Sequence, residues 1–244
     1  MKNIPRIYIN GNLEVGKSFA LSRDQAHYLT KVMRTTKFLV FNNGVEFYAE
    51  LVGAELYSAR GSHIMRPLQL THRPDPSNNL TLAFAPIKQS RMEEMIAMAT
   101  QMGVATLQPV ITERVNEKFP KWERIRKIMV EAAEQSGRNS IPKLLEPIGF
   151  KQFVETRDPR AENRLVFADE RLCNVGAEFH SARGSHIMRP LHNDTIILIG
   201  PEGGFSPAEF AALDATGAIG ISLGKTILRA ETAAVVAISK VNSE

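Results

Sequence analysis

Residues 195–209 (TIILIGPEGGFSPAE) constrain the fold of this chain more than any other stretch. Residues 195–199 are β-branched residues or leucine, and a glycine and a proline follow them, which is the pattern of a fully buried strand. Residues 206–209 supply an N-cap serine, a first-turn proline and a capping-box glutamate, which predict the start of a helix. Between these elements, three glycines in residues 200–204 allow the backbone to approach a ligand closely. We therefore predict a ligand-binding turn at the end of this strand.

A second turn of the same kind lies in residues 220–232 (GISLGKTILRAET), and the pair is more specific than either turn alone. It follows a short apolar run at residues 219–223 and precedes a predicted helix at residues 230–240. The chain has no G-x-G-x-x-G motif, and GISLGKT is one residue short of a P-loop, so nucleoside triphosphate binding is not expected. Two glycine-bearing strand ends instead suit an adenosine-bearing cofactor that is held by backbone groups.

Short apolar runs alternate with helical segments through the rest of the carboxyl-terminal part of the chain. Besides the two strands above, such runs occupy residues 80–85, 107–111 and 165–168. Helices are predicted to begin at Ser90 and at Pro120. This alternation predicts an α/β fold in which helices cover both faces of a mainly parallel sheet.

The amino-terminal part is predicted to be mostly β-structure, with strands at residues 7–9, 38–41 and 45–51. One helix interrupts it, opened by Ser22 with Gln25 three residues later. Its apolar side carries Ala26, Leu29, Val32 and Met33. Its opposite side presents His27, Lys31 and Arg34. That side is either an ordinary solvated face or a surface for a polyanion.

A change of composition separates the two parts of the chain. Residues 71–79 (THRPDPSNN) contain two prolines and no apolar residue, which predicts a linker. We therefore predict two domains, a β-rich domain at residues 1–72 and an α/β domain at residues 73–244.

Composition also narrows the class of protein. Thirty Lys and Arg against 26 Asp and Glu make the chain mildly basic, which only tilts the odds toward a polyanionic partner. The single cysteine, Cys173, excludes an intramolecular disulfide, and burial is its expected role. The chain has neither an apolar signal core nor a run of about 18 apolar residues, so we expect a cytoplasmic protein. Six histidines without ligand spacing predict no metal site.

Two segments, LIGPEGGFS and LGKTILRAETA, resemble the carboxyl-terminal signatures of the ribosomal RNA small subunit methyltransferase E family, which belongs to the SPOUT methyltransferases. The resemblance continues upstream through EAAEQSGRNSIPK, MATQMGV and HYLTKVMR. It implies a PUA-like barrel domain, a trefoil-knotted α/β domain, a homodimer, and methylation of N3 of a uridine in 16S ribosomal RNA by S-adenosylmethionine without a metal. A SPOUT 2′-O-ribose methyltransferase and a non-catalytic assembly factor with the same fold are the alternatives. Gln101 stands where the family usually has an acidic residue.

The resemblance also implies roles for particular residues. The residues that it places at the cofactor are Ile199, Gly200, Glu202, Gly204, Leu223, Gly224, Ile227, Leu228, Thr232 and Ala233. The residues that it places at the RNA are His27, Lys31, Arg34, Arg138 and Lys143, although Arg138 could also belong to an ordinary helix end.

Uridine N3 carries a proton between two carbonyls, so its methylation requires removal of a proton and dispersal of charge. Arg229 is predicted to stabilise the charge that develops on a uracil oxygen, because arginine stays protonated and is a poor base. A carboxylate is predicted to accept the proton, and Glu202 and Glu231 remain alternatives for this role. An exposed ion pair between Arg229 and Glu231 at the start of the helix is the simpler interpretation of those two residues.

An internal repeat stands apart from these motifs. Residues 54–68 (AELYSARGSHIMRPL) recur as residues 177–191 with two differences. Both copies follow predicted strands and interrupt the family resemblance, so we interpret them as insertions that the loops tolerate. Binding of RNA by their arginines is the alternative interpretation.

Overall fold

The computed structural model divides the chain into two compact units, and each is described by itself. The first comprises Met1–Pro76 and Ala133–Ile141, and the second Ser77–Ala132 and Pro142–Glu244. The structure describes residues 4–42, 44–52, 64–71, 79–117, 119–156, 164–173 and 195–242. The predicted boundary between residues 72 and 73, and most of the predicted linker, lie outside the described residues.

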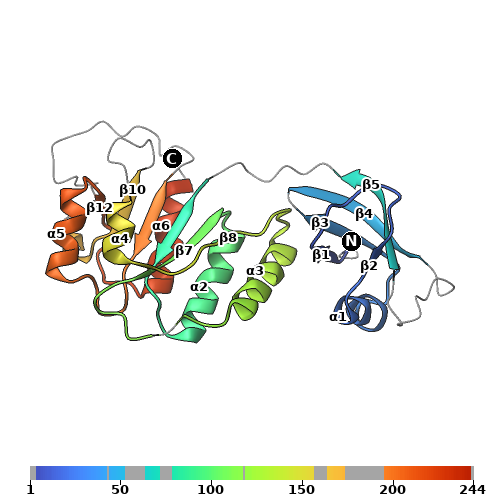
Figure 1. The fold of residues 1–244 in the computed structure, drawn as a ribbon, viewed down its shortest axis with the longest axis horizontal. Coiled ribbons are helices and arrows are strands. Elements are labelled where there is room, and N and C mark those ends of the chain that lie inside the picture. The colour runs from blue at the N-terminus through green and yellow to red at the C-terminus, as the bar shows by residue number, and fades with distance from the viewer. Residues whose placement is uncertain are drawn as a thin grey trace. The chain divides into compact units, whose positions relative to one another are not determined.

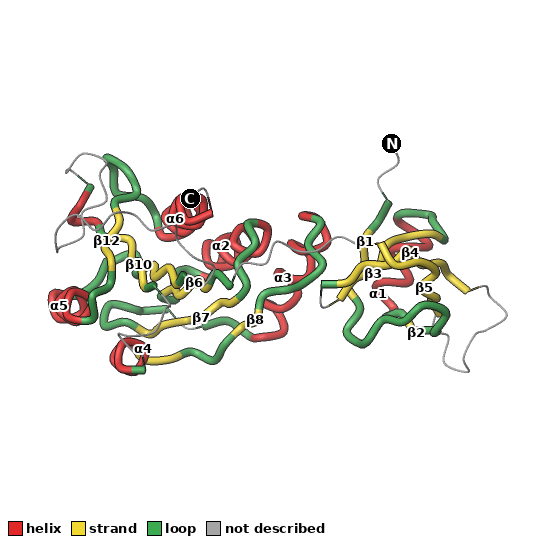
Figure 2. Tube along the Cα trace, turned by 90° about the horizontal axis from the view of Figure 1, so that it is seen from above, coloured by secondary structure: helices red, strands yellow, loops and turns green. Residues whose placement is uncertain are grey.

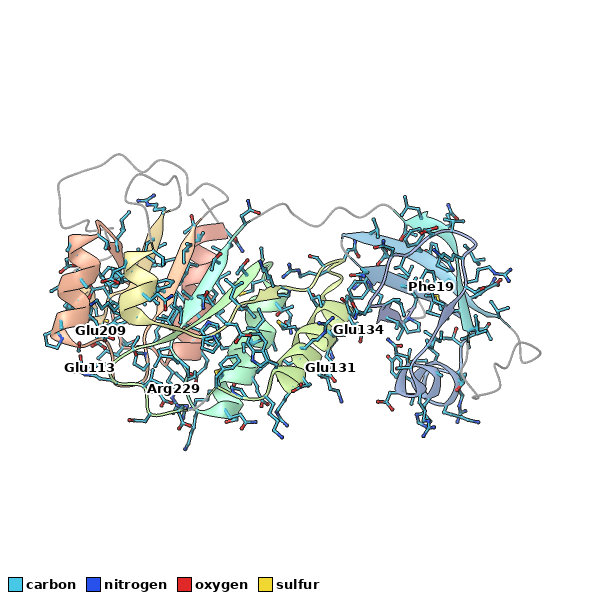
Figure 3. All side chains as sticks on the ribbon, viewed as in Figure 1. Phe19, Glu113, Glu131, Glu134, Glu209 and Arg229 are labelled. Carbon is cyan, nitrogen blue, oxygen red and sulfur yellow. The ribbon has the colours of Figure 1, made fainter. Side chains whose placement is uncertain are left out.

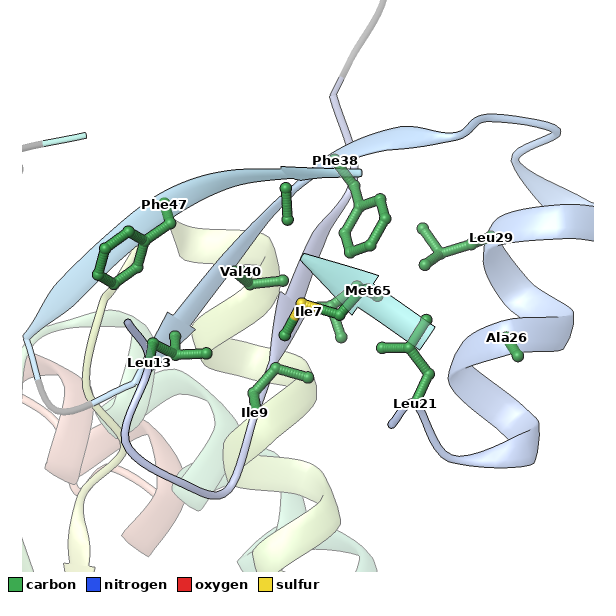
Figure 4. Close-up of a cluster of buried hydrophobic side chains, with 11 residues drawn as sticks. Ile7, Ile9, Leu13, Leu21, Ala26, Leu29, Phe38, Val40, Phe47 and Met65 are labelled. Carbon is green, nitrogen blue, oxygen red and sulfur yellow. The ribbon is translucent and has the colours of Figure 1, made fainter. Parts of the chain in front are cut away.

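The first unit contains a curled five-stranded sheet with the order β1-β3-β4-β5-β2. Its strands are β1 (Arg6–Tyr8), β2 (Phe19–Ala20), β3 (Lys37–Asn42), β4 (Val45–Val52) and β5 (Ile64–Thr71). β1 and β3 are parallel, the other neighbours are antiparallel, and the register between β4 and β5 shifts at Tyr48, which marks a bulge. One side of the sheet forms a buried apolar core with the helical segment after Ser22, as Figure 4 shows.

The helix predicted after Ser22 is present, but it changes type after one turn. Ser22 and Gln25 form the predicted capping box at the start of α1 (Arg23–His27). The chain then continues as a π-helical turn, η1 (Tyr28–Val32). A π-helical turn holds more residues than an α-helical turn, so the side chains after it change direction. The prediction of an apolar side that includes Val32 is therefore wrong, because Val32 is exposed while Ala26 and Leu29 are buried.

The end of the first repeat copy is an integral strand, not a loop insertion. Residues 64–68 lie in β5, which pairs with both β4 and β2. Met65 is fully buried in the core of this unit. Our interpretation of this copy as a tolerated insertion is wrong for these residues, because deleting them would remove a strand with two neighbours. Residues 53–63 and the whole second copy lie outside the described residues.

Arg6 on β1 is the centre of a buried polar cluster in the first unit. Its Nε donates to Glu46 Oε2 at 2.8 Å, and its guanidinium stacks 4.4 Å from the centre of the Phe41 ring. Its Nη2 donates to the Asn139 side chain at 2.7 Å and to the Arg138 carbonyl at 2.9 Å. These bonds attach residues 133–141 to the amino-terminal strands, although more than 120 positions separate them in sequence.

The second unit has a parallel sheet with the order β12-β10-β11-β6-β7-β8, and β9 also pairs with β7. Its strands are β6 (Thr81–Phe84), β7 (Thr106–Ile111), β8 (Lys143–Leu144), β9 (Ile148–Gly149), β10 (Leu165–Ala168), β11 (Ile196–Ile199) and β12 (Ile219–Ile221). The pairings between these strands are parallel. The predicted α/β class with a mainly parallel sheet is confirmed (Figure 1).

Helices cover both faces of this sheet, with α2 and α6 on one face and α4 and α5 on the other (Figure 2). Their bounds are α2 (Gln89–Gln101), α4 (Phe150–Glu155), α5 (Pro207–Ala215) and α6 (Ala230–Asn242). A further helix, α3 (Trp122–Ser136), belongs to this unit as far as Ala132 and to the first unit after it. The capping box of Ser206 and Glu209 that we predicted for α5 is confirmed. The predicted start of α2 at Ser90 is wrong, because the N-cap is Lys88, whose side chain makes no capping bond. None of the helices in the described ranges combines the length and apolar character needed to cross a membrane.

Candidate cofactor pocket

A cavity of about 330 Å³ lies at the carboxyl ends of β10, β11 and β12, which are neighbours in the sheet. The segments after these strands line it, together with Arg91 at the start of α2 and the first turn of α6. This edge of a parallel sheet is where ligands of α/β proteins usually bind, because the loops after the strands meet there. The volume is within the range of small-molecule sites.

Most of the predicted cofactor residues line this cavity. The lining residues among them are Ile199, Gly200, Glu202, Gly204, Leu223, Ile227, Leu228 and Ala233. Gly224 and Thr232 are not among the lining residues, and the Thr232 side chain is exposed. Their assignment stays a prediction that the shape of the cavity does not support directly. Cys173, which we expected to be buried, is half-buried and lines the cavity.

Contacts from several elements hold the first turn, residues 200–204. The Gly204 amide donates to the Pro201 carbonyl at 2.9 Å, and Arg114 Nη1 donates to the Gly203 carbonyl at 2.8 Å. Gly204 has a φ of +67°, a conformation that L-residues rarely adopt. The helix that follows is also attached, because Glu209 accepts from the Glu113 amide at 2.8 Å (Figure 3).

The second turn, residues 222–229, has fewer contacts. Lys240 Nζ donates to the Ser222 carbonyl at 2.9 Å, and the Ser222 hydroxyl donates to the Gly224 carbonyl at 3.3 Å. Farther along the turn from these bonds at Ser222, Ile227 is 75% exposed although it lines the cavity. Gly224 has a φ of +142°, and a Cβ at this position would have no atom within 4 Å.

Arg91 connects the two carboxylates that we predicted as alternative bases. Its Nη1 donates to Glu202 Oε1 at 3.1 Å, and its Nε lies 3.9 Å from Glu231 Oε1. The Glu231 side chain is 10% exposed, and its Oε2 has no hydrogen-bond partner among the described residues. The simpler interpretation of an exposed Arg229–Glu231 pair is therefore wrong, because Glu231 is buried and its cation is Arg91.

Arg229 and Glu202 line the cavity, whereas Glu231 lies beside it on α6 and is not among the lining residues. Arg229 is exposed, and its own carbonyl accepts from the Ala233 amide at 2.7 Å (Figure 3). Sequence reasoning missed Arg91, which is 111 positions away from Glu202. A cation in the first turn of the helix after β6, at the same sheet edge, is the signal that could have found it.

Asp169, directly after β10, organises one wall of the cavity. It binds Arg171 through both carboxylate oxygens, at 2.8 Å to Nε and 2.7 Å to Nη2. These hydrogen bonds raise the pKa of Arg171 above its ordinary value. The guanidinium also stacks 4.0 Å from the centre of the Phe210 ring, so this pair connects the end of β10 to α5.

The residues predicted to contact RNA do not all lie in one unit. His27, Lys31 and Arg34 are exposed in the first unit, at the end of α1 and in the residues after it. Arg138 is also in the first unit, is half-buried, and donates to the Ser140 hydroxyl at 3.3 Å. Lys143 is exposed on β8 in the second unit. Within the ranges that the structure describes, no group of three His, Cys, Asp or Glu residues is placed to hold a metal ion.

Comparison with known proteins first identifies the class of domain that this chain contains. The family model of the RNA methyltransferase domain matches residues 73–242, which include every strand around the cavity. The ribosomal RNA small subunit methyltransferase E of Rickettsia conorii is 32% identical, over 97% of this chain and 94% of its own length. The protein with the same name from Synechocystis is 33% identical, over 91% of this chain and 72% of its own.

A solved structure of a protein with the same name as these relatives has a similar fold. The crystal structure of a ribosomal RNA small subunit methyltransferase E from Neisseria gonorrhoeae bound to S-adenosyl methionine superposes with a TM-score of 0.82. It is 27% identical and covers 99% of this chain and 98% of its own. The chain belongs to the ribosomal RNA small subunit methyltransferase E family.

Proposed function

We propose that this protein transfers the methyl group of S-adenosylmethionine to N3 of a uridine in 16S ribosomal RNA. The observation that carries the proposal is a cavity between two glycine-bearing strand ends with an arginine, Arg229, on its lining. The relatives of the chain, which are named for ribosomal RNA methylation, support the same activity. Because ribosomal RNA is the substrate, a cytoplasmic location is part of the proposal.

The cavity fits this cofactor in size and in chemistry. About 330 Å³ is within the range of sites for ligands of this size. Ile199, Leu223, Leu228 and Ala233 supply apolar surface for a flat ring system, and the backbone of Gly200 and Gly204 is accessible between them. When bound, S-adenosylmethionine supplies a methyl group on a positively charged sulfur.

The residues of the chain would do the remaining work of the reaction. Arg229 would stabilise the negative charge that develops on a uracil oxygen when N3 loses its proton. Glu202 and Glu231 remain the alternatives for the proton acceptor. The accessible position of Glu202 on the lining favours it, whereas Glu231 is buried and would act through Arg91 by holding that guanidinium in place.

Two measurements test the reaction. Calorimetry with S-adenosylmethionine should show binding, and mass spectrometry of the methylated nucleoside should identify N3-methyluridine. A 2′-O-methylated nucleoside would instead identify the protein as a ribose methyltransferase, and cofactor binding without methylation of small subunits would favour an assembly factor. Glu202→Gln should lower turnover more than Glu231→Gln if Glu202 is the base.

The finer features of the fold are proposals as well. We propose that residues 1–72 form a PUA-like barrel that holds RNA through His27, Lys31 and Arg34, with Arg138 and Lys143 as further phosphate contacts. The exposure of the first three residues supports this role. We also propose that residues 73–244 form a trefoil knot, as the family resemblance implies.

A homodimer is proposed from residues 230–238 of α6, which are apolar on nearly all faces of the helix. Much of that surface is buried within the second unit, where α6 packs against α2, and Val235 and Val236 remain half-buried. Sedimentation velocity at micromolar concentration should show a dimer. A single species of 27.1 kDa would contradict this part of the proposal.

A further inference from the structure

The acidic residues that line the cavity differ in whether they already have a cationic partner. These residues are Asp169, Glu170 and Glu202. Asp169 is bound by Arg171, and Glu202 is bound by Arg91. No ion pair or hydrogen bond joins the Glu170 carboxylate to any of the residues that the structure describes. Among the described residues, Glu170 is therefore the lining carboxylate whose acceptors have no partner.

The backbone around Glu170 is fixed, so its side chain starts from a defined position. Glu170 is the first residue of a 3-10 turn, η3 (Glu170–Leu172), directly after β10. The Asp169 carboxylate caps this turn by accepting from the Arg171 amide at 3.0 Å, and the Cys173 amide donates to the Glu170 carbonyl at 3.2 Å. This arrangement holds Glu170 at the end of the strand that lies between β11 and β12.

The Glu170 carboxylate lies against the first glycine turn. A Cβ added to Gly204 would be 2.6 Å from Glu170 Oε1, which is closer than real Cβ contacts allow. The φ of +67° by itself favours glycine at position 204, and a side chain there would also have to displace the Glu170 carboxylate. The carboxylate therefore lies against the first glycine turn, on the lining of the cavity.

We infer that Glu170 binds the ribose hydroxyls of the adenosyl cofactor, an inference that rests on the proposed function. A carboxylate only accepts hydrogen bonds, so its ligand partner has to be a donor or a cation. The ribose is the central part of S-adenosylmethionine, and its two neighbouring hydroxyls match the two oxygens of a carboxylate. Acidic residues at strand ends bind ribose hydroxyls in this way in dinucleotide-binding folds.

The test is a set of calorimetric affinities for the full-length protein and Glu170→Gln. We expect Glu170→Gln to weaken binding of S-adenosylmethionine by about 10-fold to 100-fold, because hydrogen bonds to a charged acceptor are strong. Binding of S-adenosylhomocysteine, which lacks the sulfonium charge, should weaken by the same factor. Glu146→Gln is the matched control, because Glu146 is exposed and is not a lining residue.

The 2′-deoxy and 3′-deoxy analogues of S-adenosylhomocysteine identify the group that is recognised. They should bind the unmodified protein less tightly than the parent compound, but Glu170→Gln should no longer distinguish them from it. Equal discrimination by both proteins would overturn the inference, and so would a loss confined to S-adenosylmethionine, which would indicate recognition of the sulfonium charge.

The same binding measurements distinguish a failure of the inference from a failure of the proposed function. If the unmodified protein binds S-adenosylmethionine and Glu170→Gln binds it as tightly as Glu146→Gln does, the inference is wrong and the proposed function stands. If the unmodified protein binds neither S-adenosylmethionine nor S-adenosylhomocysteine, the proposed function is wrong and the inference falls with it.

Discussion

The two turns that line the cavity look alike in sequence but differ in how the rest of the protein holds them. Residues 200–204 are tied by a hydrogen bond from Arg114 and by the ion pair of Glu202 with Arg91, and the Glu170 carboxylate lies against Gly204. Residues 222–229 are held mainly at their base, and Ile227 is 75% exposed. One wall of the site is thus formed before the ligand arrives, and the other has freedom to adjust around it.

The largest effect is expected at the fixed turn. Gly204→Val should weaken cofactor binding by about 100-fold to 1,000-fold, because a side chain there adds backbone strain and displaces the Glu170 carboxylate. Calorimetry measures the loss, and a thermal melt shows whether the fold persists. Gly203→Val is the matched control, because its Cβ would meet only the Arg114 side chain, at 3.6 Å. Equal affinities for the two variants would show that the turn is not held as described.

Substitution of Arg229, at the end of the second turn, tests methyl transfer and not cofactor binding. Arg229→Ala should reduce turnover roughly 100-fold, because it removes a donor that stabilises developing charge. Cofactor affinity should change far less, since the wall formed by residues 200–204 is intact. Single-turnover kinetics with small ribosomal subunits, beside calorimetry of the same variant, separate the two effects. Normal turnover would reject this role for Arg229.

A smaller effect is expected at the open turn. Gly224→Ala should weaken cofactor binding by about 10-fold, because a φ of +142° is strained for alanine although space for the methyl group is free. The difference between the losses of cofactor affinity in Gly224→Ala and Gly204→Val measures how much the contacts of the first turn contribute beyond backbone strain. If both variants lose affinity equally, the two turns are equally constrained and the comparison above is wrong.

Cys173 offers a readout of ligand binding that needs no change to either turn. It is the single cysteine of the chain, and it is half-buried on the lining of the cavity. Saturating S-adenosylmethionine should slow alkylation of this thiol several-fold, because bound ligand covers the lining. Mass spectrometry of the intact protein gives the rate. Gly204→Val should show no protection, whereas protection in that variant would contradict its predicted loss of binding.

Much of the fold and of the pocket backbone could be predicted because their signals are local. The buried run at residues 196–199 and the capping box of Ser206 and Glu209 each require only a few consecutive residues. The glycine turns are local too, so most of the predicted cofactor residues line one cavity.

The errors have a different origin, since they arise where distant parts of the chain meet. Arg91 reaches Glu202 across 111 positions, and Glu170 becomes notable only because it packs on Gly204. The π-helical turn that exposes Val32 is a separate case, because it departs from the regular helical spacing on which that prediction rested. The strand at residues 64–68 was missed because a near-identical second copy favoured an insertion over pairing with β2 and β4.

The buried cluster around Arg6 has a consequence for the order in which the two units can fold during synthesis. The first unit needs residues 133–141, whose carbonyls and Asn139 side chain surround the Arg6 guanidinium. A ribosome that has translated only the first 76 residues has therefore produced an incomplete domain, in which a buried arginine still lacks most of its acceptors. Amino-terminal domains commonly fold first during synthesis. Here, completion of the amino-terminal domain must wait until much of the second unit has already emerged.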